Sequence, residues 1–436
     1  MVISRHITGV IRTRRYIVEI VLGMIYVLIP WLSINGKPLM RLDIPERKFH
    51  LLGAIYIPQE GIFLHLFLLT MGLSLFLFTS LIGRVWCGWA CPQTVFTDFF
   101  DFIGRLVQGK KYGKKDASLF SKILLYTVWL LVSFVSSFHI IAYFNDPQFM
   151  IQAYTNGESW KYSFPYFTLF FTFTLMADMV FVREQFCKYA CPYAKFQTVL
   201  MDADSYNVTY DYKRGEPRRN KTVKIGDCTA CNMCLVVCPT GIDIRDGLNV
   251  GCIACGKCVD ACTVQMGKEN KKSLIGYYSL NQIEKKEPIR WVRPRTIVYA
   301  TLLLVVIITS ITLLINRVPL YLSIIPDRNI APILDPAKNT IKNFYTVNLR
   351  NISYEDMNLK FEIEKDSNLE PNILIGSDTS TLNLKPDSSE QIKLILESKN
   401  IGPSFTSKIT SLKLNIIDQK RNITLTRQLP MRFKHE

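Results

Sequence analysis

The sequence predicts an α-helical membrane protein with five spans, a cysteine-rich insert before the last span and a C-terminal β-sandwich. Three observations predict this class: five long apolar runs, twelve cysteines confined to residues 87–262, and short alternating strands after residue 317. Hydrophobic residues make up 49% and aromatic residues 12% of the 436 residues, which is rich for a soluble protein. The net charge of +16 fits basic cytoplasmic loops beside anionic lipid, so we expect membrane lipid and no nucleic acid as a partner.

The predicted spans are apolar runs of roughly 20 residues, the length that a bilayer requires. They lie near Tyr16–Ile34, Ile62–Ile82, Leu119–Phe144, Phe164–Val182 and Thr296–Ile315. Basic residues are dense before the first span, after the second and over 183–295, whereas 145–163 has only Lys161. The loop at 35–61 fits this pattern least. The positive-inside rule therefore places the N-terminus in the cytoplasm and, after an odd number of spans, the C-terminus outside.

Two cysteine pairs repeat one hundred residues apart, each directly after a predicted span. Residues 86–96 read WCGWACPQTVF and residues 186–196 read FCKYACPYAKF, so Cys87 and Cys91 correspond to Cys187 and Cys191. The predicted topology puts all four thiols at one depth on the cytoplasmic face. Because soft thiolates select Cu(I), zinc or iron–sulfur clusters, we predict a third redox or copper site there. The alternative is a set of buried structural thiols at a helix junction.

Charged and polar residues near the spans are further candidates. Arg84 and Arg183 precede the two motifs. The simpler interpretation is that they reach lipid headgroups, and the other is that they offset the charge of a thiolate-bound metal.

His65 and His139 lie toward the outer face and either form a copper or haem pair or bond to neighbouring helices. Asp178 is a candidate proton relay or an arginine partner. If Cys87 and Cys91 are helical, their spacing puts them on one helix face, with a proline that interrupts that helix or opens the next.

Residues 228–262 carry the most specific motif. Two runs of four cysteines have the spacing of bacterial ferredoxins, in which three cysteines of a run hold one [4Fe–4S] cluster and the fourth ligates the other. The first predicted ligand set is Cys228, Cys231, Cys234 and Cys262, and the second is Cys252, Cys255, Cys258 and Cys238. Zinc also binds C-x-x-C pairs, but eight cysteines at this spacing without a nearby histidine favour iron–sulfur. Disulfide frameworks are typical of small secreted domains, so a long chain with several predicted spans favours metal ligation over disulfides.

Residues 317–436 lose helical periodicity and gain strand alternation. Apolar residues alternate at Tyr345, Val347 and Leu349, and again around Leu394 and Leu414, with turn residues between the runs. This pattern predicts an immunoglobulin-like β-sandwich. It has no cysteine pair and one histidine, His435, so we expect a structural or docking module. The predicted domains are a membrane domain (1–200), a ferredoxin domain (201–290), the fifth span (291–316) and the sandwich (317–436).

Taken together, GRVWCGWACPQTVFTDFFD, REQFCKYACPYAKFQTVLMD, the double ferredoxin motif and the sandwich resemble the FixG/RdxA/CcoG family over essentially the whole chain. These are accessory proteins for assembly of cbb3-type cytochrome c oxidase. The resemblance implies a bacterial inner-membrane protein with a cytoplasmic ferredoxin domain and a periplasmic sandwich. It implies a cupric reductase that supplies Cu(I) for the oxidase. We expect copper chaperones or a transporter and oxidase subunits as partners, and our own hypothesis for the catalytic site is Cys87, Cys91, Cys187 and Cys191.

Two other functions remain open at this point. The paired C-x-x-x-C-P motifs also resemble membrane subunits proposed to pass electrons between quinols and ferredoxin-type clusters, which would give a quinol-linked subunit with no copper role. A scaffold with structural clusters is the third. The sequence has no G-x-G-x-x-G dinucleotide motif after a strand, so we expect an external, unidentified cytoplasmic electron donor.

Overall fold

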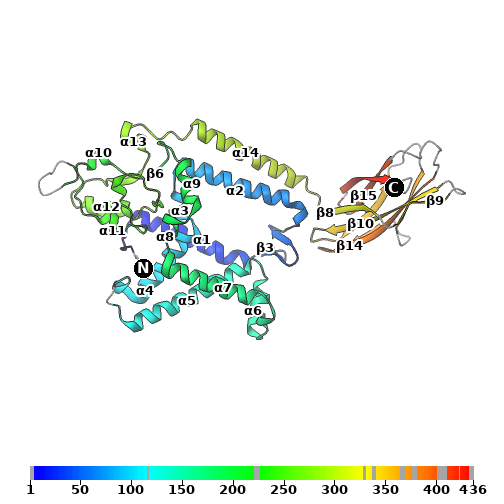
Figure 1. Ribbon diagram of the computed structural model, residues 1–436, viewed down its shortest axis with the longest axis horizontal. Helices are drawn as coiled ribbons and strands as arrows, with labels where there is room; N and C mark the ends of the chain where they lie inside the picture. The colour runs from blue at the N-terminus through cyan, green and yellow to red at the C-terminus, as the bar shows by residue number, and fades with distance from the viewer. Residues whose placement is uncertain are drawn as a thin grey trace. The chain divides into compact units, whose positions relative to one another are not determined.

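The computed structural model describes residues 4–114, 117–219, 226–327, 330–335, 340–363, 370–375, 381–399, 410–421 and 423–431. His435 lies outside these residues. The chain divides into two compact units (Figure 1). The first combines residues 1–43 with 61–311, and the second combines residues 44–60 with 312–436.

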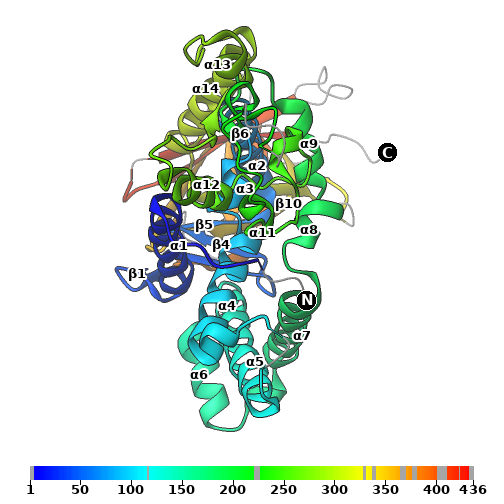
Figure 2. The same ribbon diagram turned by 90° about the vertical axis from the view of Figure 1, so that its left-hand side faces the viewer.

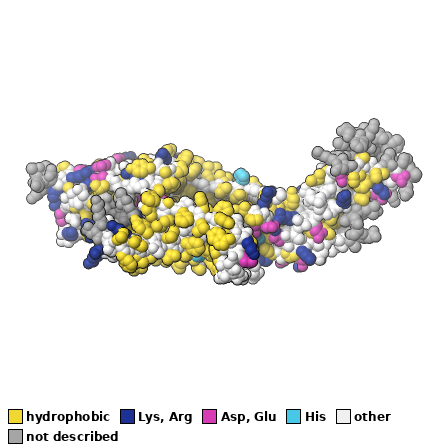
Figure 3. Space-filling view, turned by 60° about the horizontal axis from the view of Figure 1, so that its bottom comes forward, with side chains coloured by type: hydrophobic (Ala, Val, Ile, Leu, Met, Phe, Trp, Pro, Cys, Tyr) yellow, Lys and Arg dark blue, Asp and Glu magenta, His cyan; other side chains and the backbone are white. Residues whose placement is uncertain are grey.

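Four helical stretches of the described chain are long and apolar enough to cross a membrane, and they match four of the five predicted spans. They are Pro58–Ile82, which contains α2 (Gly61–Ile82), α5 (Leu119–Ala142), Phe164–Val182, which contains α7 (Phe164–Ala177), and α14 (Pro294–Ile315). Hydrophobic side chains crowd the surface of the first unit, which contains these helices (Figure 3). That surface is suited to acyl chains.

The first predicted span differs from the prediction. Helix α1 (Val10–Leu28) begins earlier, ends before Ile34 and carries Arg12, Arg15 and Glu19 in buried positions, so it is not among the four apolar stretches. It nevertheless runs alongside α5: the Tyr26 hydroxyl donates to the carbonyl of Ser136 over 2.5 Å, and the Tyr143 hydroxyl donates to the carbonyl of Tyr26 over 2.8 Å. The charged N-terminal part of α1 contacts the ferredoxin region, where Arg15 donates to the carbonyl of Cys255 over 3.2 Å.

Each cysteine motif breaks the chain into two further helices after its span. These helices are α3 (Val85–Trp89), α4 (Pro92–Gln108), α8 (Gln185–Tyr189) and α9 (Pro192–Leu200). Cys91 and Cys191 are extended N-cap residues, and Pro92 and Pro192 open the next helix, where a missing N–H costs nothing. Each cysteine pair therefore spans a helix break and does not share one helix face. A short helix α6 (Pro147–Thr155) and strands β1 (Ser33–Ile34), β2 (Lys37–Pro38) and β3 (Met40–Asp43) complete the connections.

The ferredoxin region is small and built around its cysteines. An antiparallel pair, β6 (Asn207–Tyr210) and β7 (Ile275–Tyr278), brackets the two cysteine runs. Its helices are α10 (Tyr212–Gly215), α11 (Met233–Val236), α12 (Lys257–Gly267) and α13 (Leu280–Lys285). Figure 2 faces the end of the unit at which α3, α8, α11 and α12 gather. The Asp260 carboxylate of α12 accepts from the backbone N–H groups of Ile11 and Arg12 and so caps the start of α1.

The second unit is the predicted β-sandwich. One sheet has the order β12–β14–β10–β8, with β9 beside β10, and the other has the order β13–β11–β15–β16. Its strands are β8 (Leu320–Pro326), β9 (Ile333–Asp335), β10 (Thr340–Asn351), β11 (Met357–Ile363), β12 (Glu370–Ile375), β13 (Thr381–Leu384), β14 (Ser389–Lys399), β15 (Thr410–Asp418) and β16 (Ile423–Met431). The predicted alternation is confirmed, because Tyr345, Val347, Leu349, Leu394 and Leu414 all point into the core between the sheets.

A hairpin from the first half of the chain belongs to this unit. Strands β4 (Lys48–Leu51) and β5 (Ala54–Tyr56) pair with each other. Lys48 forms a 2.7 Å ion pair with Asp387, and His50 shares a 2.6 Å hydrogen bond with the hydroxyl of Tyr354.

Candidate redox centre at the membrane motifs

Two cavities in the ferredoxin region separate the eight cysteines as the swapped ligand pattern requires. One cavity is lined by Cys228, Cys231, Cys234 and Cys262. The other is lined by Cys238, Cys252, Cys255 and Cys258, and is also reached by Cys234. No disulfide joins any of the twelve cysteines, all of which lie in the described chain. The fourth cysteine of each run therefore lines the cavity of the other run.

The backbone around the two cavities repeats. Ala230 and Ala254 hold matching positive φ values of 51° and 52°, and Asn232 and Gly256 hold 56° and 72°. These left-handed residues let the chain curl around the cavity. Backbone N–H groups of Ala254, Ile242 and Leu274 each point at a cysteine sulfur, namely that of Cys252, Cys238 and Cys262, over 3.4 Å. Hydrogen bonds of this kind stabilise the negative charge of a cluster and tune its potential.

These features fit a pair of iron–sulfur cubanes. The donors are thiols alone, and a cubane keeps its four cysteines farther apart than a single ion would. No group of three or more His, Cys, Asp or Glu side chains within the described chain is drawn together as a single-ion site. That statement includes the four membrane-motif cysteines.

The membrane motifs lie directly against the second cysteine run. Cys87 and Cys187, each 8% exposed, pack into one buried cluster with Ile253 and Cys255. Cys91 and Cys191 are half-buried at the adjoining helix starts. Burial, and then the nearby thiols, raises the pKa of Cys87 and of Cys187 to about 12. The structure therefore brings both motifs together around protonated thiols.

Gly88 makes this contact possible. A Cβ at Gly88 would overlap the carbonyl oxygen of Ile253 and would lie 2.7 Å from the Cα of Cys255. No real side chain tolerates such an approach, so glycine lets the loop of the second run press onto α3. A second contact fixes the same loop: the Trp89 indole N–H donates to the Tyr277 hydroxyl over 3.0 Å, and that hydroxyl donates to the carbonyl of Ala254 over 2.8 Å.

The interpretation of Arg84 and Arg183 as lipid-facing anchors is wrong, because both side chains are buried, with 2% and 4% exposed. Arg84 donates to the carbonyls of Val250 and Cys252 in the ferredoxin region, and also to Ala194 and Thr198 of α9. It therefore joins the second motif to the loop of the second cysteine run.

Arg183 has a different role. It pairs with Asp101 of α4 and follows a π-helical turn over Asp178–Val182. Its φ of 52° and ψ of −137° fall in a region that non-glycine residues rarely adopt. The corresponding residue of the first motif is Gly83, whose φ is 58°. The ion pair holds Arg183 in a conformation that glycine adopts in the other half.

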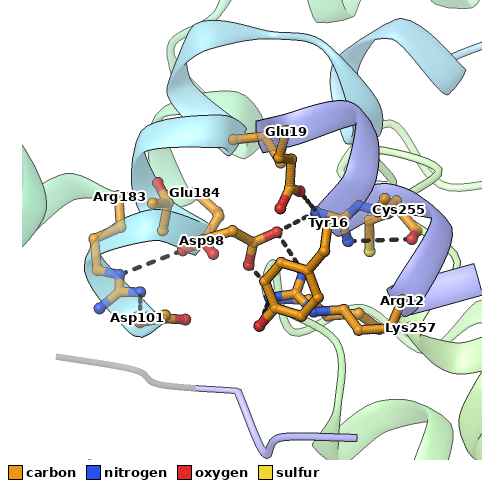
Figure 4. Close-up of polar contacts among 12 residues, drawn as sticks. Arg12, Tyr16, Glu19, Asp98, Asp101, Arg183, Glu184, Cys255 and Lys257 are labelled. Carbon is orange, nitrogen blue, oxygen red and sulfur yellow. Dashed lines mark hydrogen bonds and ion pairs between the residues drawn. The ribbon is translucent and has the colours of Figure 1, made fainter. Parts of the chain in front are cut away.

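A buried charge cluster, absent from the sequence prediction, lies beside this contact. Dashed contacts converge on Asp98 of α4 in Figure 4. Arg12 and Lys257 contact its carboxylate over 2.6 and 3.1 Å, and Arg15 forms a further ion pair with it. Burial raises the pKa of Asp98, but these three cations outweigh burial and hold it well below its ordinary value. No sequence signal identified this cluster, because its contacts join residues as far apart in the chain as Asp98 and Lys257, which are 159 positions apart.

Comparisons with known proteins place the chain in a family. Protein RdxA of Cereibacter sphaeroides is 34% identical to this chain, over 96% of this chain and 93% of its own length. The chain belongs to the FixG/RdxA family. Protein RdxB of the same organism is 33% identical over 84% of this chain and 83% of its own length. Nitrogen fixation protein FixG of Rhizobium meliloti is 29% identical over 82% of this chain and 78% of its own length.

Three family models match parts of the chain. Residues 182–280 match a 4Fe-4S dicluster domain, residues 64–111 match a 4Fe-4S binding domain, and residues 310–431 match the IG-like fold at the C-terminus of FixG. The protein is therefore a membrane-associated iron–sulfur electron-transfer protein of this family. The second of these matches includes Cys87 and Cys91 of the first membrane motif.

The remaining candidates within the spans are not drawn into the site. His65 and His139 each bond to a carbonyl of their own helix, that of Gly61 over 3.2 Å and that of Val135 over 2.8 Å. Asp178 accepts a 2.7 Å hydrogen bond from the side chain of Gln93 in α4, a partner that the sequence did not suggest.

Proposed function

We propose that this protein reduces Cu(II) to Cu(I) at Cys87, Cys91, Cys187 and Cys191, with electrons that reach them through the ferredoxin region. One observation carries the proposal: the loop holding Cys255 packs on α3 at Gly88, so that Cys255 contacts the cluster formed by Cys87 and Cys187. A short path from an iron–sulfur site to metal-binding thiols is what a metal reductase needs.

The eight ferredoxin cysteines are the proposed cluster ligands, in the two sets that line the two cavities. When bound, each [4Fe–4S] cluster supplies one electron at a time. Each copper ion accepts one electron, so one reduced cluster converts one Cu(II) to one Cu(I). An external one-electron donor of the cytoplasm renews the supply.

The membrane thiols determine which metal state is favoured. Thiolates are soft ligands that prefer Cu(I) over Cu(II), so copper held by these sulfurs is easier to reduce than copper in water. Because burial keeps Cys87 and Cys187 protonated, metal binding must displace protons from them. The guanidinium of Arg84, close to Cys87, Cys191 and Cys252, offsets part of the charge of the resulting thiolates.

The cellular setting is part of the same proposal. The N-terminus and the ferredoxin region face the cytoplasm and the sandwich faces the periplasm of the bacterial inner membrane. Cu(I) passes to copper chaperones or a transporter whose thiol or thioether ligands share its preference. Subunits of a cbb3-type oxidase are the proposed final recipients.

Copper stoichiometry and cupric reductase activity of anaerobically purified protein test this function. We expect Cys87→Ser and Cys191→Ser to lose bound copper and Cu(I) production while retaining about eight iron atoms per chain. Ala90→Ser and Ala190→Ser add the same hydroxyl at neighbouring motif positions and should leave both properties intact. Unchanged copper binding and activity in both cysteine variants would contradict the proposal.

The iron count separates the alternatives. About twelve iron atoms per chain, falling to about eight in the Cys87→Ser variant, would assign the membrane thiols to a third cluster and not to copper. Rapid reduction of the clusters by a quinol, in a protein that binds no copper, would replace the proposal with a quinol-linked subunit.

A further inference from the structure

The two cysteine runs have similar backbone conformations, but they carry different residues before the third cysteine. That residue is Met233 in the first run and Lys257 in the second. Each is the first residue of its helix, α11 or α12, after a left-handed residue. The two side chains therefore hold equivalent positions beside their cavities, and one of them carries a positive charge.

The second cavity is surrounded by further buried cations. Arg15, which is 0% exposed, donates to the carbonyl of Cys255 over 3.2 Å. Arg84, 2% exposed, donates to the carbonyl of Cys252 over 3.2 Å. Lys257 itself is 6% exposed. Three cations thus approach the second set from α1, from α3 and from its own helix.

Carboxylates only partly balance these cations. Asp98 is shared by Arg12, Arg15 and Lys257, and Glu19 contacts Arg15 over 2.8 Å. Asp260 is occupied at the start of α1. No carboxylate of the described chain forms an ion pair with Arg84, whose partners are carbonyls and Thr198.

The first cavity is lined by one cation, and that cation has a carboxylate partner of its own. Its cation Arg245 forms a 2.5 Å ion pair with Asp243. Arg5 contacts Met233 from an exposed position, where solvent screens its charge. Cys231 is exposed as well.

We propose that Lys257, together with Arg15, raises the reduction potential of the second cluster above that of the first. This inference rests on the proposed assignment of the eight cysteines to two clusters. Reduction adds one negative charge, so a nearby cation favours the reduced state. Burial has the opposite effect, but it also weakens the screening of Lys257 and Arg15, and these cations lie beside the second set alone. Lys257 and Arg15 act on the reduction potential through their charge, and the ion pairs with Asp98 hold both side chains in place.

The consequence is a direction for the electron. With the higher potential at the second set, an electron shared by the two sites resides mainly there, and Cys255 of that set contacts Cys87 and Cys187. The first set, with its exposed Cys231, is left as the point of entry.

Potentiometric EPR titration of full-length protein in detergent, purified anaerobically, tests this inference. Lys257→Met gives the second run the residue that the first run has at this position, and Asp98 retains its ion pairs with Arg12 and Arg15. We expect only the higher-potential wave to move, in the negative direction, by about a tenfold change in the reduced-to-oxidised ratio, which is 59 mV for one electron. Lys268→Met removes the same charge from the exposed end of α12 and should move neither wave.

The reciprocal variant assigns the waves. Met233→Lys should raise the lower-potential wave and leave the other in place. If Lys257→Met moves neither wave, or moves the lower one, the inference is overturned.

Two results separate this inference from the proposed function. A shifted wave in a protein that reduces no copper would contradict the copper proposal and leave the inference standing. Copper reduction with unshifted waves would contradict the inference alone.

Discussion

The two membrane motifs share a backbone but have different surroundings. Both place one cysteine in a five-residue helix and the other at the N-cap of a proline-initiated helix. The first motif has Gly88 against the ferredoxin loop, whereas the corresponding Lys188 of the second donates to the carbonyl of Thr240 over 3.3 Å. The repeat therefore fixes where the thiols lie, and the differences determine how each half attaches to the ferredoxin region.

The halves also exchange contacts. Gln197 of α9, from the second half, accepts a 3.1 Å hydrogen bond from the thiol of Cys87, and Gln93 of α4, from the first half, donates to Asp178. Arg84 bonds to α9 and Arg183 bonds to α4. Because each half stabilises the other, the four thiols form one structural unit, and four kinds of substitution can test this comparison.

Asp98→Asn should have the largest effect on stability. It leaves Arg12, Arg15 and Lys257 buried without their carboxylate, and breaking a buried ion pair in this way costs about 3–5 kcal/mol. The matched position in the other half is Thr198, and Thr198→Ala should cost less, about 1.5–3 kcal/mol, for its hydrogen bond to the charged Arg84. Denaturant unfolding in detergent micelles measures both. Equal losses would show that the Asp98 cluster contributes no more to stability than the single hydrogen bond of Thr198.

Arg183→Gly tests the strained position. The substitution relieves about 1–3 kcal/mol of backbone strain but leaves Asp101 buried without its cation, which costs about 3–5 kcal/mol. We therefore expect a net loss of stability. The double variant Arg183→Gly with Asp101→Asn should recover most of that loss, because no unpaired charge remains. A single variant as stable as the parent protein would show that the ion pair contributes no more than the backbone strain that glycine relieves.

Gly88→Ala tests the contact between α3 and the ferredoxin loop. The added methyl group overlaps Ile253 and Cys255, and such overpacking costs about 1–3 kcal/mol. Cu(I) production should also slow, because the loop must move away from Cys87. Gly72→Ala is the matched control: nothing lies near its Cβ, and alanine favours a helix by about 1 kcal/mol. Normal Cu(I) production by Gly88→Ala would mean that this contact is not on the electron path.

Gln197→Leu should have the smallest effect. It removes the acceptor of the Cys87 thiol and a 3.4 Å hydrogen bond to Thr79, with an expected loss of about 0.5–1.5 kcal/mol. Thr97→Val, at the matched position of α4, removes a hydrogen bond within its own helix and should cost less. The same unfolding measurement compares them, and a larger loss for Thr97→Val would contradict the exchange of contacts between the halves.

Sequence patterns predicted those parts of the protein that depend on local spacing. Four spans and the alternation in the sandwich follow from short-range periodicity. The spacing of the eight cysteines predicts two ligand sets, and these are the cysteines that line the two cavities. The charge clusters do not. Arg84 and Arg183 next to a span end fit a headgroup anchor equally well, and only contacts with partners such as Asp101 and Cys252 show that they are buried. The start of α1 is a similar case, since its arginines are accommodated by Asp98, far away in the sequence.

The most direct test of the central claim is a single-turnover experiment under anaerobic conditions. Protein reduced in advance and freed of reductant is mixed with Cu(II), while cluster absorbance and chelated Cu(I) are followed together. We expect about two Cu(I) per chain, formed as both clusters are oxidised, and none from protein whose clusters are oxidised at the start. The Cys87→Ser variant should keep its clusters reduced and form no Cu(I). Cluster oxidation and Cu(I) formation at the parent level in that variant would contradict the account.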